Sequence, residues 1–115
     1  TARARGLPLV LICIALLGVA RSDSVALEEE NFDSIVGKSE LPWMVMFHLP
    51  RCGHCKRLAP VWDQVAAAAK QEELQVGVGR VDCSSQPNIC ERFGVTSFPA
   101  LKVLREGGAK ATDLR

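Results

Sequence analysis

The sequence predicts a single α/β domain, and three observations carry this prediction. Short apolar segments typical of strands alternate with longer segments whose apolar residues recur at helical spacing. Residues 43–49 are almost continuously apolar, which indicates a central strand covered on both faces. The length of 115 residues suits one domain of common size. We therefore expect one sheet flanked by helices.

The first part of the domain is predicted to hold two strands and one helix. Residues 25–27 form a short strand. Residues 28–36 form a helix that ends at Gly37, and residues 43–49 form the central strand. The predicted helix has one apolar face, made of Phe32, Ile35 and Val36.

The longest predicted helix follows the central strand and spans residues 53–70. Its apolar residues recur at helical spacing: Leu58, Val61, Trp62, Val65, Ala66 and Ala69. Pro60 removes one backbone donor and predicts a kink. Residues 76–81 then form a strand, residues 87–93 a short helix and residues 100–104 a further strand.

Two cysteines lie three residues apart where the central strand turns into this helix. Cys52 is expected at the helix N-terminus, where free backbone N–H groups and the helix dipole lower the pKa of a thiol. Cys55 lies one turn later on the same face, where it can attack a mixed disulfide formed on Cys52. The spacing therefore predicts a catalytic dithiol, with Cys52 as nucleophile and Cys55 as resolving thiol.

The alternatives for this pair are half of a zinc site and a purely structural disulfide. Zinc generally takes four ligands, and His54 lies too close to both cysteines along the chain to join them readily in one tetrahedron. Cys83 and Cys90 would complete four sulfurs only if the fold placed them nearby. We therefore favour redox chemistry and expect no metal.

Two segments resemble the protein disulfide isomerase family of thioredoxin-fold oxidoreductases. One is Cys52-Gly53-His54-Cys55 with the following Lys-Arg-Leu-Ala-Pro-Val-Trp, and the other is Phe-Gly-Val-Thr-Ser-Phe-Pro-Ala at residues 93–100. Cysteines at 83 and 90 resemble domains of the thioredoxin domain-containing protein 5 type. The resemblance implies a thioredoxin-like fold with a central mixed sheet flanked by helices. We expect its final strand and helix to be largely missing, as in a shortened chain.

The resemblance also implies roles for residues around the dithiol. Gly53 and His54 would tune its redox properties, with the imidazole stabilising the thiolate. Pro99 would be a cis-proline that faces the cysteines, and Ser97 and Phe98 would line a groove for an extended peptide. The alternatives are an exposed polar turn residue for His54 and an ordinary loop proline for Pro99.

Two positions depart from the pattern of the resembled family. Met46 stands where the family usually has a buried acid that exchanges protons with the resolving thiol, and a thioether cannot accept that proton. Arg51 replaces the usual tryptophan before the first cysteine, where its charge should lower the pKa of Cys52 further. His48 is a candidate relay in place of the missing acid, but a half-buried polar residue is the simpler interpretation.

Cys83 and Cys90 allow two interpretations. They are either small, inert, buried thiols or a structural disulfide between the end of a strand and the next helix. A loop this short gives at best about 2.5 kcal/mol of stabilisation.

The N-terminus is typical of a secretory signal peptide. Arg3 and Arg5 precede an apolar run over residues 7–17, and small residues precede a cleavage position after Ala20. The alternative is a signal anchor, but about 20 apolar residues are needed to span a bilayer. We predict a signal at residues 1–20, a thioredoxin-like domain at 21–115, and location in the endoplasmic reticulum lumen, although no retention signal is seen.

The predicted function is a thiol-disulfide oxidoreductase or isomerase of the secretory pathway. Its partners would be unfolded or misoxidised secretory proteins, with glutathione or an upstream oxidase. No metal or organic cofactor is expected, no membrane contact after signal cleavage, and a net charge of +1 gives no indication of nucleic acid binding. The alternative is a client-binding module that is weakly active or inactive.

Overall fold

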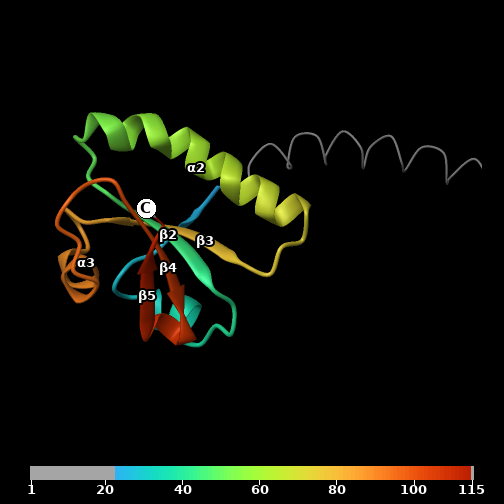
Figure 1. The fold of residues 1–115 in the computed structure, drawn as a ribbon. Coiled ribbons are helices and arrows are strands. Elements are labelled where there is room, and N and C mark those ends of the chain that lie inside the picture. The colour runs from blue at the N-terminus through green and yellow to red at the C-terminus, as the bar shows by residue number, and fades with distance from the viewer. Residues whose placement is uncertain (1–22, 115) are drawn as a thin grey trace, which may run out of the picture.

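The computed structural model describes residues 23–114, which form one mixed five-stranded sheet with helices on both faces (Figure 1). The elements in chain order are β1 (Val25–Ala26), η1 (Asp33–Gly37), β2 (Trp43–His48), α2 (Gly53–Gln71), β3 (Gly77–Asp82), α3 (Pro87–Arg92), β4 (Ala100–Arg105), η2 (Glu106–Gly108) and β5 (Lys110–Asp113). The predicted signal peptide lies outside the described residues. Among residues 23–114, no helix is both long enough and apolar enough to cross a membrane.

The strand order is β1-β3-β2-β4-β5. β3 pairs in parallel with both β1 and β2, whereas β4 runs antiparallel to β2 and β5 antiparallel to β4. The predicted α/β class with a central mixed sheet is therefore confirmed. The final strand, which we expected to be largely missing, is present as the four-residue β5.

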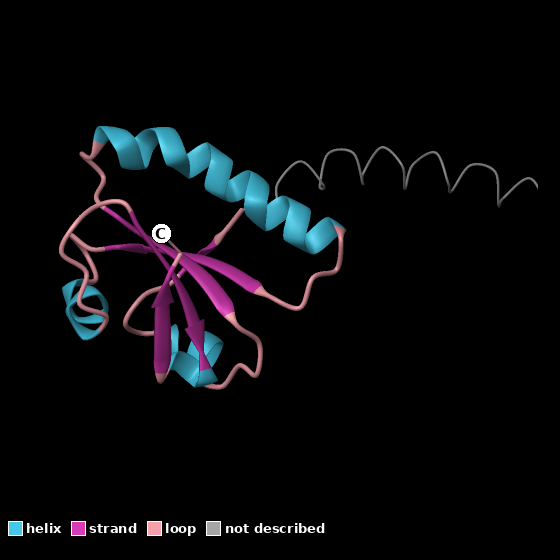
Figure 2. Ribbon diagram, in the orientation of Figure 1, coloured by secondary structure: helices cyan, strands magenta, loops and turns pink. Residues whose placement is uncertain are grey.

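α2 covers one face of the sheet, while η1 and α3 lie on the other (Figure 2). The side chains of β2 alternate between the two layers. Phe47 and Val45 are buried against η1 and α3, and Met46 is buried under α2. This explains the continuous apolar run in β2, since neither of its faces meets water.

Most predicted elements appear within one or two residues of their expected bounds, but the helix predicted at residues 28–36 is shorter. The helical residues of this segment are Phe32, with φ −58° and ψ −49°, and the π-turn η1 that follows it at Asp33–Gly37. The preceding turn is held by Asn31, whose side chain accepts a hydrogen bond from Glu28 N–H at 2.7 Å and donates to the Ala26 carbonyl at 3.2 Å. The Asn31 side chain thus satisfies the Glu28 N–H, which has no partner at the start of a helical turn.

Trp62 fixes α2 to the sheet. Its side chain is 4% exposed, and its indole Nε1–H donates to the Gly79 carbonyl of β3 at 2.8 Å. On the opposite face of the sheet, a β-carbon on Gly79 would stand 2.7 Å from Leu27 Cδ1, so this position of β3 favours glycine. α2 continues through Pro60 without interruption. The helix that carries both candidate cysteines is thus held by a buried anchor in its middle.

Candidate active site

The Cys52 thiol lies where α2 begins, as the sequence predicts. Cys52 is the N-cap residue, with extended backbone angles of φ −80° and ψ 120°. Its Sγ accepts a hydrogen bond from the backbone N–H of Cys55 at 3.2 Å, in the manner of a capping oxygen. A negative charge at this position is stabilised by the free N–H groups and by the helix dipole.

Several groups lower the pKa of Cys52. The largest effect comes from the Cys55 thiol, which donates to the Cys52 sulfur, and the Cys55 backbone N–H acts in the same direction. Partial burial opposes them, while the backbone N–H of His54 and the charge of Arg57 lower the pKa further. Cys52 is also half-exposed. It therefore has both properties of an attacking thiolate, charge and access.

Cys55 has the opposite environment. Its side chain is only 3% exposed, and burial raises its pKa, as does its hydrogen bond to Cys52. The proton therefore stays on Cys55 when Cys52 is ionised. The two sulfurs therefore differ, since Cys52 is half-exposed and more easily ionised, whereas Cys55 is buried and keeps its proton.

These opposite shifts predict two separate steps in alkylation. Because the pKa of Cys52 is lowered, its thiolate persists to a lower pH than that of an ordinary thiol, and its reaction with iodoacetamide should stay fast until pH passes the lowered pKa. Cys55 should react only at a higher pH than an ordinary thiol. Mass spectrometry of each cysteine as a function of pH measures both. A Cys52 that titrates near the ordinary value of about 8.5 would contradict the assignment.

A loop with a cis-proline lies beside Cys52. The Phe98–Pro99 peptide bond is cis, and the Phe98 carbonyl oxygen lies 3.9 Å from Cys52 Sγ. Ser97 and Pro99 line an adjacent groove of about 790 Å³, whereas Phe98 is outside its lining. The cis-proline predicted from the resemblance is therefore present and close to the nucleophile.

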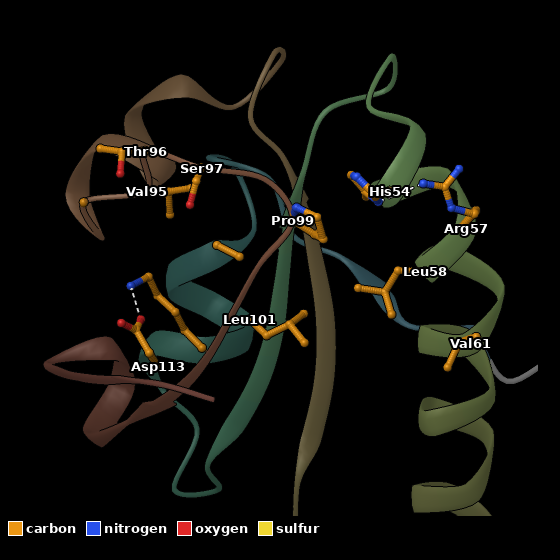
Figure 3. Close-up of a pocket in the computed structure, with 13 residues that line it drawn as sticks. His54, Arg57, Leu58, Val61, Val95, Thr96, Ser97, Pro99, Leu101 and Asp113 are labelled. Atoms are coloured by element: carbon orange, nitrogen blue, oxygen red, sulfur yellow. Dashed lines mark hydrogen bonds and ion pairs between the residues drawn. The ribbon is translucent and has the colours of Figure 1, made fainter. Parts of the chain in front are cut away.

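The groove runs between α2 and the segment that leads into β4 (Figure 3). His54 and Arg57 form part of its α2 wall, and Leu58 and Leu101 lie between the helix and β4. Sequence reasoning missed most of this lining, namely Arg57, Leu58, Val61, Leu101, Lys102 and Asp113. The signal for Arg57 was available, because it lies one helical turn after His54 and so on the same face.

The imidazole of His54 contacts Arg57. Arg57 Nη2 donates to His54 Nδ1 at 2.8 Å. Arginine is only a donor, so Nδ1 carries no proton in this contact. His54 acts on Cys52 through its backbone N–H, a different route from the imidazole contact that the resemblance implied. Gly53 opens α2, and Arg51 is exposed just before Cys52.

Cys83 and Cys90 form a disulfide with a Cα–Cα distance of 5.8 Å. It joins the end of β3 to α3, where Cys90 is buried in the core on the side of η1 and α3. The interpretation of two inert thiols is therefore wrong. The bridge also occupies the two sulfurs that a zinc site with the dithiol would need, and residues 23–114 contain no group of three or more metal-ligating side chains placed to hold an ion.

The position of the family's usual buried acid is occupied by a side chain that cannot ionise. Met46 is 1% exposed and packs under α2. His48 lies on the same face of β2, is half-buried and pairs in register with Asp82. Burial lowers the pKa of His48, Asp82 opposes this and Arg80 adds to it. The lowered pKa favours the neutral imidazole, which is the form that can accept a proton.

A mixed sheet with a redox-capable dithiol at the start of a helix, opposite a cis-proline loop, defines a thioredoxin-fold domain. Residues 23–114 match the thioredoxin family, and the chain belongs to that family. It is 40% identical over 94 residues to protein disulfide-isomerase erp38 of Neurospora crassa, covering 82% of this chain and 26% of that protein. It is 39% identical over 106 residues to protein disulfide-isomerase A3 of Gallus gallus, covering 90% and 20%. The chain thus spans about a quarter or less of these relatives.

Solved structures agree with the fold. The first thioredoxin domain of mouse protein disulfide-isomerase A4 aligns with a TM-score of 0.70 and 30% identity, over 78% of this chain and 62% of that one. The Trx4 domain of ERdj5 aligns with a TM-score of 0.71 and 26% identity, over 82% and 83%. The resemblance to the protein disulfide isomerase family is confirmed. The narrower likeness to the thioredoxin domain-containing protein 5 type stays a prediction.

Proposed function

We propose that this domain catalyses thiol-disulfide exchange in secretory proteins through Cys52 and Cys55. The observation that carries the proposal is the pairing of Cys52, a half-exposed thiol of lowered pKa, with Cys55, a buried thiol of raised pKa. Cys52 Sγ also lies 3.9 Å from the Phe98 carbonyl, next to the cis-proline. The similarity to proteins named protein disulfide-isomerase supports it.

In the reducing direction, the Cys52 thiolate attacks one sulfur of a client disulfide. A bond forms between Cys52 and that sulfur, and the other client sulfur leaves as a thiolate and takes up a proton. Cys55 then loses its proton and attacks Cys52 Sγ, which releases the second client thiol. The client disulfide gains two electrons, and Cys52 and Cys55 become a disulfide.

In the oxidising direction, the same steps run backward. A client thiolate attacks the Cys52–Cys55 disulfide at Cys52, Cys55 leaves as a thiolate, and a second client thiolate displaces Cys52. In isomerisation, Cys52 attacks a wrong client disulfide, and another thiol of the same client then displaces Cys52 from the mixed disulfide. No net electron transfer takes place. Glutathione or an upstream oxidase would restore the required redox state of the dithiol.

The proposed partners are unfolded or misoxidised secretory proteins, and the proposed location is the endoplasmic reticulum lumen. The predicted N-terminal signal supports this location. The Cys83–Cys90 bridge supports it as well, because stable disulfides are typical of oxidising compartments.

The direct test is insulin reduction by the protein in the presence of glutathione. A catalyst produces precipitated insulin chains over many turnovers per molecule, at a rate proportional to protein concentration. Stoichiometric capture of insulin without turnover would instead support the second candidate, a client-binding module. The buried Met46 specifically favours this second candidate, because Cys55 lacks the usual local acid for proton exchange.

Replacing Met46 by glutamate is expected to speed release of a trapped mixed disulfide near neutral pH. The new carboxylate would accept the Cys55 proton, and general base catalysis typically contributes about 10²–10⁴-fold, although burying the carboxylate lowers stability. Met46→Gln is the matched control, since it has a similar shape and no ionisable group. Equal release rates in both variants and the natural protein would mean that another acceptor, with His48 as first candidate, already serves.

A further inference from the structure

The surface around Cys52 carries unbalanced positive charge. Arg51, Lys56 and Arg57 are all exposed and lie within five positions of the nucleophile. The sequence has no acidic residue between Glu40 and Asp63. Among the described residues, none of the three cations forms an ion pair with a carboxylate. The nucleophile therefore lies in a field that attracts anions.

No free carboxylate in the lining of the groove balances this positive charge. Its lining contains one acid, Asp113, whose Oδ1 lies 2.6 Å from Lys102 Nζ and is neutralised there. The loop at residues 94–101 carries no charged side chain. Arg57 is thus the unpaired charge of the groove, on the wall that faces Pro99 (Figure 3).

We propose that this groove selects client segments with aspartate or glutamate beside the reacting cysteine. The inference rests on the proposed function and names its substrate class. An extended peptide along the Pro99 loop places neighbouring residues at about 3.3 Å per position from its cysteine. Acidic residues within two positions then lie within roughly 7 Å of the reacting cysteine, which is less than the Debye length of about 8 Å. The planar guanidinium of Arg57 also suits a carboxylate, to which it can donate two hydrogen bonds.

The test uses the Cys55→Ser protein, which stops the reaction at the mixed disulfide. Three peptides differ only in the two residues that flank a single cysteine, which are glutamate, glutamine or lysine. Each cysteine is linked by a disulfide to 5-thio-2-nitrobenzoate. The Cys52 thiolate attacks the peptide sulfur, the peptide becomes disulfide-bonded to Cys52, and the coloured thiolate leaves. Dividing each rate by the rate with 2-mercaptoethanol removes differences in intrinsic reactivity.

We expect the glutamate peptide to react about 10-fold faster than the lysine peptide at low salt, with glutamine between them. The ratio should approach one at about 1 M salt, where the Debye length is about 3 Å. Equal rates for all three peptides at low salt would overturn the selectivity and leave the proposed function standing. The proposed function would be overturned by a different result, namely a Cys52 that reacts with all three peptides no faster than an ordinary thiol. The two failures can therefore be told apart.

A matched pair of variants assigns the selectivity to Arg57. Arg57→Gln should reduce the glutamate-to-lysine ratio several-fold, and Arg57→Glu should bring it to one or below. Lys70→Gln removes the same charge from an exposed site about 20 Å further along α2 and should leave the ratio unchanged. Loss of Arg57 also weakens the Cys52 thiolate, but this slows all three peptides equally, so the ratio reports recognition alone. An unchanged ratio in Arg57→Gln would overturn the assignment.

Discussion

Replacing Cys52 by serine is expected to reduce insulin reduction to the rate of glutathione alone. A serine hydroxyl is not ionised near neutral pH and does not attack a disulfide. Within residues 23–114, no other thiol can take over the first step, because Cys55 is 3% exposed and Cys83 is joined to Cys90. The measurement is the insulin assay with equal concentrations of both proteins, after circular dichroism has shown that the variant is folded.

The matched control is Cys55→Ser, which should fail in a different way. Cys52 remains able to attack, but nothing resolves the product, so a covalent complex with the client accumulates on Cys52. Non-reducing electrophoresis and mass spectrometry detect it. A covalent complex on Cys55 in the Cys52→Ser protein would reverse the roles assigned to the two cysteines.

The parts of the site that local sequence determines were predictable. The position of Cys52 follows from an apolar strand, a short turn and a helical pattern within about 30 residues, and no distant contact is needed to place it. The same holds for β2 and α2, whose apolar patterns are long. The resemblance to the protein disulfide isomerase family added the cis-proline, which spacing alone could not supply.

The groove could not be predicted, because its lining is brought together by strand pairing between segments that are far apart in the sequence. Asp113 reaches Lys102 through the β4–β5 register, and Leu101 reaches the α2 side through the β2–β4 pairing that sets it opposite Met46. The disulfide of Cys83 and Cys90 remained open for a similar reason, since it depends on a Cα–Cα distance that spacing does not determine. The turn before η1 depends on one side chain, Asn31, whose hydrogen bonds to Glu28 N–H and to the Ala26 carbonyl no hydrophobic pattern indicates.

Replacing Trp62 by alanine should cost about 3–5 kcal/mol of the free energy of unfolding. The indole is buried between α2 and the sheet, and its loss removes both the apolar contact and the hydrogen bond to the Gly79 carbonyl. A small domain has about 5–15 kcal/mol in total, so the variant should be close to unfolded at ordinary temperature. Chemical denaturation followed by the fluorescence of Trp43, the only other tryptophan, measures the difference.

Two further variants separate the causes of this loss. Trp62→Phe keeps most of the apolar volume but leaves the Gly79 carbonyl without the indole donor, which should cost about 1–3 kcal/mol. Val61→Ala changes the neighbouring residue, which is 49% exposed, and should stay within about 0.5 kcal/mol. If Trp62→Ala were no more costly than Val61→Ala, α2 would be held by its termini, and the position of the dithiol would not depend on the buried indole.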